Sequence, residues 1–280
     1  MKDGIYERLS FEEYQAEEGL NGSSIVHMRR SPMQFRYMTD NPQPATPAMV
    51  LGTATHRLIL EPDRVGDFAV WGEEEGQNVR RGAVWVAFQA ANYDKMIVTK
   101  AERDQMVGMA TAVRKYLPIR KYADAKGPTE VSLFWHDPVN GRRMKARLDK
   151  WIPSLHTVFD LKTTRAASSH QFGAQSYKLG YHIKMAIQYE GIRVLTGTKP
   201  HVKLGALESK APHESAVYRV TKDVILQGLE ELDALVKKLD ECEKLNQWPP
   251  EMETESDLIL PAWAVTTEES SLDEFAEVED

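Results

Sequence analysis

The sequence predicts a mixed fold, either α+β or mixed α/β, rather than a doubly wound parallel sheet. Helical periodicity is present over residues 10–60 and 85–116, alternating apolar strands occupy residues 129–162, and helical periodicity returns from residue 171. Helices, then strands joined by short turns, then helices again are typical of an antiparallel sheet packed against helices.

The composition divides the chain into a large body and an acidic tail. The 280 residues suffice for one large domain or two small ones, and we expect one domain over residues 1–263 and a tail over 264–280. Seven of the 42 acidic residues lie in the tail, so 35 remain in the body against 35 basic ones. A neutral body can still carry a basic channel, so the net charge of -7 does not exclude nucleic acid.

Three further features concern the cellular context and the tail. The chain has no apolar run of membrane-spanning length and no signal-peptide pattern, so we expect a cytoplasmic protein. The single Cys242 excludes an internal disulfide and a cysteine-based zinc cluster. The tail is expected to be disordered or to bind a partner through its apolar residues, Leu272, Phe275 and Val278.

The N-terminal region is predicted to contain short capped helices. Ser10 and Glu13 form a capping box, and Ser23 is expected to cap the next segment, after an Asn21–Gly22 turn. Ser31, followed by a proline at the first helical position, starts a further helix.

A proline-rich connection over residues 41–47 leads into a largely apolar helix over 48–60, which we expect to be buried. Residues 63–82 are predicted to form an exposed loop. Helical structure then extends over 85–116, with a second capping box at Thr99.

The β-rich part comprises three segments, TEVSLFW, RMKARLDKWI and TVFDLKTT, which end at Thr164. Asn140 and Gly141 predict a hairpin between the first two, and Pro153 and Ser154 separate the second from the third. Residues 171–195 are predicted to be helical, 202–220 to contain one or two strands, and 222–246 to form a long amphipathic helix.

Two carboxylates and a lysine are predicted to meet on the second hairpin. Asp149 and Asp160 lie eleven residues apart and converge if their strands pair, and Lys162 shares the face of Asp160 because side chains alternate along a strand. Carboxylates are hard ligands for Mg²⁺, and a lysine can orient or deprotonate a water or steady a phosphate. The same pattern also occurs in solvated strand ends and local ion pairs.

Two more residues are candidate ligands. His56, in a helix with several small residues, is either an ordinary core histidine or a metal ligand that faces the hairpin. Glu130 is either an ordinary strand-end carboxylate or a third acidic ligand, which would allow two ions to act on the attacking and leaving oxygens.

Several arginines are candidate phosphate contacts, although most exposed arginines are simply solvated. Such contacts make DNA binding salt-dependent without sequence preference. The residues proposed to contact DNA are Arg29, Arg30, Ser31, Arg36, Arg80 and Arg81.

Seven segments between about residues 20 and 195 form a series: SSIVHMRRSPMQFR, TPAMVLGTATHRLILEPDRV, NVRRGAVW, TEVSLFW, KARLDKWI, DLKTT and GYHIKMAIQYEG. In this order they resemble the PDDEXK-superfamily exonucleases of phages and prophages, the RecE-type or exodeoxyribonuclease VIII-like group. That group is distantly related to lambda exonuclease and to RecB-type nuclease domains. The resemblance implies a restriction-endonuclease-like PDDEXK core, in which helices flank a central mixed sheet.

The resemblance also implies roles by position. Asp149 and Asp160 match the acids of the motif, Lys162 its lysine, His56 the histidine of a GxxxH helix, and Glu130 an upstream acid. The carbonyl of Leu161 is a further candidate ligand. One departure is that Lys184 and Gln188 stand where relatives usually have Gln and Tyr; Gln188, one turn from Lys184, is a candidate for the polar role at the site.

The function implied is a Mg²⁺-dependent exonuclease with two ions, Mn²⁺ being an alternative. It would digest one strand of linear duplex DNA from its 5′ end and leave a 3′ overhang for a single-strand annealing protein, as a trimeric or tetrameric ring in a bacterial host cell. A catalytically decayed DNA-end-binding scaffold is the alternative. A Cas4-like or RecB-like nuclease is disfavoured because a lone cysteine cannot hold an iron–sulfur cluster.

Overall fold

The structure is a computed structural model that describes residues 1–74, 79–252, 255 and 257–259. The acidic tail predicted over residues 264–280 lies outside the described residues. No helix of the described part is both long and apolar enough to pass through a bilayer.

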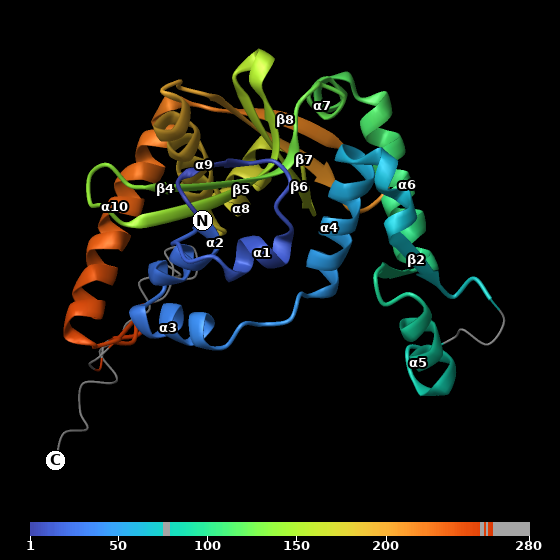
Figure 1. The fold of residues 1–280 in the computed structure, drawn as a ribbon, viewed down its shortest axis with the longest axis horizontal. Coiled ribbons are helices and arrows are strands. Elements are labelled where there is room, and N and C mark those ends of the chain that lie inside the picture. The colour runs from blue at the N-terminus through green and yellow to red at the C-terminus, as the bar shows by residue number, and fades with distance from the viewer. Residues whose placement is uncertain (75–78, 253–254, 256, 260–280) are drawn as a thin grey trace, which may run out of the picture.

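A six-stranded mixed sheet forms the centre of the molecule (Figure 1). Its spatial order is β1-β4-β5-β6-β7-β8, and all neighbouring strands are antiparallel except β6 and β7, which are parallel. The predicted fold class, a central mixed sheet flanked by helices, is therefore confirmed. The strands are β1 (Gly4–Tyr6), β4 (Thr129–His136), β5 (Arg143–Ile152), β6 (Thr157–Thr164), β7 (His201–Glu208) and β8 (Ser215–Val220).

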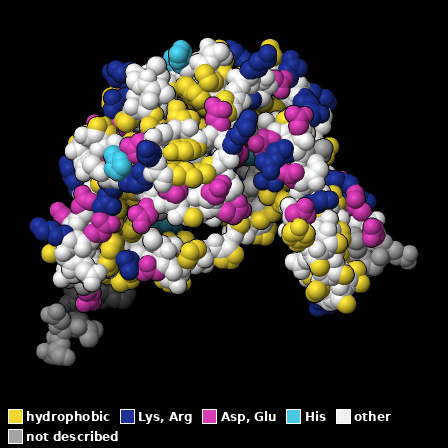
Figure 2. Space-filling model, in the orientation of Figure 1, with side chains coloured by type: hydrophobic (Ala, Val, Ile, Leu, Met, Phe, Trp, Pro, Cys, Tyr) yellow, Lys and Arg dark blue, Asp and Glu magenta, His cyan; other side chains and the backbone are white. Residues whose placement is uncertain are grey.

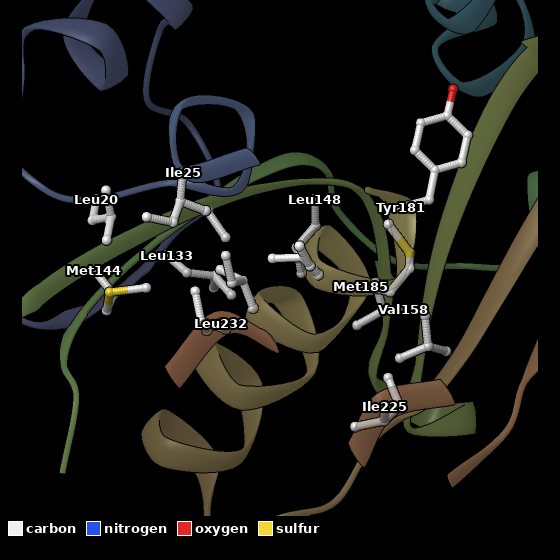
Figure 3. Packing of buried hydrophobic residues seen from close by; sticks show 14 of the residues in the cluster. Leu20, Ile25, Leu133, Met144, Leu148, Val158, Tyr181, Met185, Ile225 and Leu232 are labelled. Atoms are coloured by element: carbon white, nitrogen blue, oxygen red, sulfur yellow. The ribbon is translucent and has the colours of Figure 1, made fainter. Parts of the chain in front are cut away.

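Two hydrophobic clusters cover the two faces of this sheet. Val158 of β6 belongs to the larger cluster, which packs under α9 (Tyr181–Thr196) and α10 (Lys222–Leu245) and is seen from close by in Figure 3. Phe159 and Leu161, on the other face of β6, belong to the second cluster. That cluster includes residues of α4 (Pro47–Leu60), α6 (Lys100–Lys115) and α7 (Leu117–Ala123). The alternation read in the sequence of β6 thus builds both layers.

The N-terminal helices follow the predicted capping pattern with one correction. Ser10 caps α1 (Phe11–Ala16) in a capping box, and Ser31 caps α3 (Pro32–Asp40), as expected. Ser23 is not the cap of the segment between them. Asn21 caps α2 (Gly22–Ile25) instead, because its side-chain oxygen accepts hydrogen bonds from two backbone amides, at 2.9 and 3.0 Å. A short 3-10 helix, η1 (Val26–Arg29), follows directly.

The prediction of a buried helix over residues 48–60 is wrong for its first turn. In α4, which Thr46 caps, Ala54, Thr55 and Leu60 are buried, whereas Met49 is 60% exposed. The apolar composition reflects one buried stripe on a helix whose N-terminal end extends beyond the sheet.

The exposed loop predicted over residues 63–82 is wrong in part, and the two helices expected within 85–116 are separated by a strand that was not predicted. A 3-10 helix, η2 (Pro62–Asp67), and a strand, β2 (Phe68–Trp71), occupy the first segment, and β3 (Met96–Thr99) interrupts the second. β2 and β3 form a parallel pair beside α5 (Gly82–Ala91), which projects from the body (Figure 1). The capping box at Thr99 is confirmed.

The C-terminal part of the chain contains three helices and two strands among the described residues. The helical stretch predicted over 171–195 consists of α8 (Ser169–Lys178) and α9, which are separated at Gly180. Gly180 has φ +66°, and a Cβ there would lie 2.7 Å from a methyl group of Val26, so glycine is required on both grounds. The predicted strands over 202–220 and the long C-terminal helix are present as β7, β8 and α10.

Candidate active site

The two aspartates lie where β5 and β6 diverge. Pairing between these strands is confined to Lys150–Ile152 and Thr157–Phe159, so Asp149 and Asp160 follow directly beyond the last paired residues. In the gap, Asp149 Oδ2 accepts a hydrogen bond of 2.8 Å from the backbone N–H of Leu161. The hairpin that the sequence predicted therefore brings the two acids together and fixes one of them to the backbone of the other strand.

Lys162 joins the two carboxylates. Its ammonium forms an ion pair with Asp160 Oδ2 and lies 4.0 Å from Asp149 Oδ2. Asp160 is buried, with 2% of its side chain exposed, and Lys162 and Asp149 are 22% and 17% exposed. Two carboxylates face one ammonium group in this largely buried cluster, so these three side chains together carry an excess of negative charge.

The charges at this site are reflected in the pKa values. Burial, and then the charge of Asp160, raises the pKa of Asp149 to about 7. Burial is also the largest influence on Lys162 and would lower its pKa, but the charges of Asp160 and Asp149 raise the pKa of Lys162 above its ordinary value. Lys162 is therefore protonated in this arrangement, and the carboxyl group of Asp149 is partly protonated near neutral pH.

Gln188 approaches the carboxylate of Asp160 from the helix that covers it. Its amide nitrogen lies 3.3 Å from Asp160 Oδ1 and 3.5 Å from the carbonyl of Arg147. The buried position of Gln188 on α9 explains this contact, because α9 packs directly over β4 and β5. The structure thus places this predicted residue beside the acids.

His56 reaches the site from α4. Its Nδ1 atom is 3.4 Å from Asp149 Oδ2. Burial, and then the positive charge of Lys162, lowers the pKa of His56 to about 4. The imidazole is therefore neutral at neutral pH, which is the form that binds a metal.

Glu130 lies opposite Asp149 across the β4–β5 pair but is held away from it. The flanking residues pair as Thr129–Lys150 and Val131–Leu148, and Glu130 between them has φ +52°. Its carboxylate accepts a hydrogen bond of 2.8 Å from Arg147. Burial, and then the charge of Asp149, raises the pKa of Glu130 despite this hydrogen bond.

The donor set suits a divalent cation. Asp160 Oδ2 is buried and its contact is the Lys162 ammonium, and the carboxylate oxygens of Asp160 and Asp149 are of the hard type that Mg²⁺ prefers. Within the described ranges, no three His, Cys, Asp or Glu side chains already converge on one point, so the site is not a closed metal cage. The Lys162 ammonium supplies the positive charge between the acids.

Among the described residues, no hydrogen bond or ion pair joins the predicted DNA contacts to Asp149, Asp160 or Lys162. Arg29 forms an ion pair with Glu231 and donates to the carbonyl of Tyr177, each at 2.7 Å. Ser31 is buried and accepts the capping hydrogen bond from the backbone of Gln34 at 3.0 Å. These two residues therefore have structural partners.

The other arginines are more exposed. Arg36 pairs with Asp40 at 2.7 Å, and Arg80 pairs with Glu102 at 3.1 Å. Arg30 lies 3.8 Å from a carboxylate on the chain that follows α10, and Arg81 precedes α5 on the surface. Their role toward DNA remains a prediction.

Sequence reasoning assigned no role to three residues near the acids. Arg147 bonds Glu130 and donates to Ser132 Oγ at 2.8 Å, which ties β5 to β4 beside Asp149. Tyr181 and Lys184 lie on α9 next to Lys162. Their spacing of three residues on one helix face was visible in the sequence, but their proximity to β6 depends on the tertiary packing.

Comparisons with known proteins concern the family and the fold. Residues 23–256 match the family described as a PDDEXK-like domain of unknown function (DUF3799). A crystal structure of a protein from Eubacterium rectale, described as a "Putative exonuclease", is similar with a TM-score of 0.63 at 15% identity, over 97% of this chain and 99% of that chain. At this identity the likeness concerns the fold.

A second solved structure, of SSO0001, is 14% identical over 80% of this chain and 81% of that chain, with a TM-score of 0.36. This score is too low to support any argument. No curated protein matches the sequence significantly.

Proposed function

The chain belongs to the PDDEXK-like domain family DUF3799, and from this membership we propose that it is a metal-dependent nuclease that digests linear double-stranded DNA from its ends. The family and the structural neighbour described as a "Putative exonuclease" together suggest a nuclease. The observation that carries the proposal is the meeting of Asp149, Asp160 and Lys162 at the point where β5 and β6 diverge.

The residues have distinct roles in this proposal. Asp149 and Asp160 would hold Mg²⁺, with His56 or Glu130 completing the site and the Leu161 carbonyl as a further candidate. Bound there, the metal would polarise a phosphate oxygen and lower the pKa of a water. A second ion, or Mn²⁺, is compatible with the same acids.

Lys162 would exchange its present partners for the substrate. In this structure its ammonium neutralises the two carboxylates. When a cation takes over that task, the lysine is free to hold the attacking water or a phosphate oxygen. Gln188 would keep Asp160 oriented through the amide contact at 3.3 Å. Such positioning groups act by fixing the geometry of the reacting atoms.

The finer features of the proposal rest on the resemblance to RecE-type exonucleases. These are digestion from the 5′ end, a 3′ overhang for a single-strand annealing protein, and a role in phage or prophage recombination in the bacterial cytoplasm.

Self-association into a ring is part of the same proposal, and α5 supports it. Val84 and Val86 of this helix are 56% and 62% exposed, and no residue of α5 is buried. Figure 2 shows hydrophobic side chains gathered on the projecting part of the molecule at the lower right. An apolar helix without a charged residue is a surface that a second copy of the chain would cover.

The test is digestion of linear duplex DNA labelled separately at each 5′ and 3′ end, with a closed circular duplex as the control, in Mg²⁺ and in EDTA. The proposal predicts Mg²⁺-dependent loss of the 5′ label with the circle intact. Cutting of the circle would show an endonuclease instead. Binding without digestion under all metal conditions would favour the decayed scaffold, for which the replacement of the usual Gln by Lys184 is the supporting observation.

A further inference from the structure

A second lysine lies beside Lys162 and has no role in the reaction described so far. Lys184 is on α9, three residues after Tyr181, and its ammonium nitrogen is 5.7 Å from the centre of the Tyr181 ring. The ammonium nitrogen of Lys162 is also 5.7 Å from the centre of that ring. Two positive groups therefore lie at the same distance from one aromatic side chain, and one of them contacts the carboxylate pair.

Lys184 is half-buried without an anionic partner. Among the described residues, no ion pair or hydrogen bond of its ammonium is present, although Lys162 nearby pairs with both aspartates. Its aliphatic stem packs on Gly22, where a Cβ would lie 2.9 Å from Lys184 Cγ. Because exposed lysines keep their ammonium in water, a lysine held partly out of water without a counter-charge is costly to the fold.

The surroundings of Lys184 are mostly positive. Burial, and then the charge of Lys162, lowers the pKa of Lys184 although the charge of Asp160 acts in the other direction, and burial followed by the charge of Lys184 lowers the pKa of His27 on η1. The carboxylate of Asp160 is already engaged by Lys162 and Gln188. Among the described residues, Lys184 therefore contacts no carboxylate of its own, and a cation bound by Asp149 and Asp160 would leave its ammonium free for an anion from outside the chain.

We propose that Lys184 is a phosphate-binding residue of the active site, which holds a phosphate group of the DNA strand beside Tyr181 and Lys162. The inference rests on the proposed nuclease function, because that function brings a polyanion to this site. RecE-type exonucleases, which this chain resembles, usually have a neutral glutamine at this position. Lys184 would therefore add one positive charge to the contacts with the DNA phosphates.

The test separates binding from catalysis. Affinity for a short linear duplex is measured by fluorescence anisotropy in EDTA, over a range of salt concentrations, for the wild type, Lys184→Met, Lys184→Gln and Lys184→Arg. Lys222→Met, at the exposed start of α10, is the matched control. We expect Lys184→Met and Lys184→Gln to bind roughly tenfold more weakly, with a salt slope smaller by about one, and Lys184→Arg to retain most of the affinity.

Thermal unfolding supplies the readout that a purely structural lysine would not give. Lys184→Met keeps the length of the stem and removes the uncompensated charge, so its Tm is expected to equal or exceed that of the wild type while its affinity falls. A loss of stability in Lys184→Met and Lys184→Gln together with unchanged affinity would overturn the proposal. Affinity equal to that of Lys222→Met in all three variants would overturn it as well.

The same assay distinguishes the two sources of phosphate and keeps this inference separate from the nuclease proposal. If the effect of Lys184→Gln disappears on duplexes with 5′-hydroxyl ends, Lys184 binds the terminal phosphate. If the effect persists, Lys184 binds a phosphodiester of the strand. Wild-type protein that binds DNA through Lys184 but never digests it would refute the nuclease and leave this inference standing.

Discussion

Asp149 is the residue at which the electrostatic cost of the site is concentrated. Its carboxylate is fixed by the Leu161 amide, lies close to a second buried acid, and has a pKa raised to about 7. A protein gains nothing for stability from two buried acids that repel each other. A bound cation would remove this repulsion, so the arrangement of the two acids suits cation binding.

This cost predicts a pH-dependent effect of Asp149→Asn in the absence of metal. The folded state keeps a proton on Asp149 that the unfolded chain releases near pH 4, so stability falls as the pH rises from about 4 to 7. Asn accepts the same backbone hydrogen bond without the charge. The variant should therefore match the wild type near pH 4 and exceed it above pH 7, by roughly a few kcal/mol.

Urea unfolding in EDTA at about pH 4.5 and about pH 8, roughly the two ends of that window, measures the effect. Added Mg²⁺ should stabilise the wild type at the higher pH and leave Asp149→Asn unchanged. A variant less stable than the wild type at the higher pH would contradict the assignment of the repulsion to Asp149.

Sequence predicts the contacts of a residue where they follow from the alternation of side chains along a strand. It predicted that Asp149, Asp160 and Lys162 would meet, and the hairpin of β5 and β6 brings them together. It gave no reason to expect Arg147 to bind Glu130, because that contact depends on the β4–β5 register and on φ +52° at Glu130. Nor does the sequence indicate that Arg29, a predicted DNA contact, binds Glu231, which is 202 residues away in the chain.

Among the elements, α9 has the most direct influence on the site. It carries Tyr181, Lys184 and Gln188, and α10 presses on its outer side at Gly228. A Cβ at Gly228 would lie 2.4 Å from the carbonyl oxygen of His182. The position of α9 over the carboxylates thus depends on a close approach that only glycine permits.

Gly228→Ala is therefore expected to force α9 and α10 apart. Overpacking of this kind costs about 1–3 kcal/mol of unfolding free energy, and the displaced Gln188 should reduce cleavage. Gly173→Ala in α8, where a Cβ would meet nothing within 4 Å, is the control and should be neutral or slightly stabilising. Equal Tm values and equal cleavage rates for the two variants would refute this account of α9.

Element prediction succeeded for long periodic segments and failed for short ones. The long helix α10 and the strands β4 to β6 were expected, since each repeats its pattern several times. β2 and β3 have four residues each, which is too short for alternation to be recognised, and they are stabilised by pairing with each other. The sequence of the neighbouring helix α5 predicts a helix but does not show whether that helix packs against the body.

In the whole molecule, α5 is a helix with exposed apolar side chains outside the two hydrophobic clusters of the sheet. Hydrophobic clusters cover both faces of the sheet, whereas Val84 and Val86 of α5 are exposed. Figure 2 shows hydrophobic side chains on the projecting part of the molecule. Overall composition gave no indication of this, because an apolar helix of ten residues looks the same in a core and on an interface.

If a second copy covers α5, a charge on it should prevent self-association. The double variant Val84→Glu/Val86→Glu is expected to sediment as a monomer at concentrations where the wild type forms an oligomer. Val139→Glu, on an 86% exposed side chain in the β4–β5 turn, is the control and should behave like the wild type. Sedimentation velocity at several concentrations measures this, and a wild type that is monomeric throughout would remove α5 as support for a ring.

Asp149, Asp160 and Lys162 are proposed to form a metal-dependent phosphodiester-cleaving site. This proposal is tested by single-turnover digestion of end-labelled linear duplex in Mg²⁺ by the wild type, Asp160→Ala and Lys162→Ala, with circular dichroism and thermal unfolding of the same samples. We predict no detectable cleavage by either variant while the fold is retained. Cleavage at the wild-type rate by a folded Asp160→Ala or Lys162→Ala protein would contradict the account.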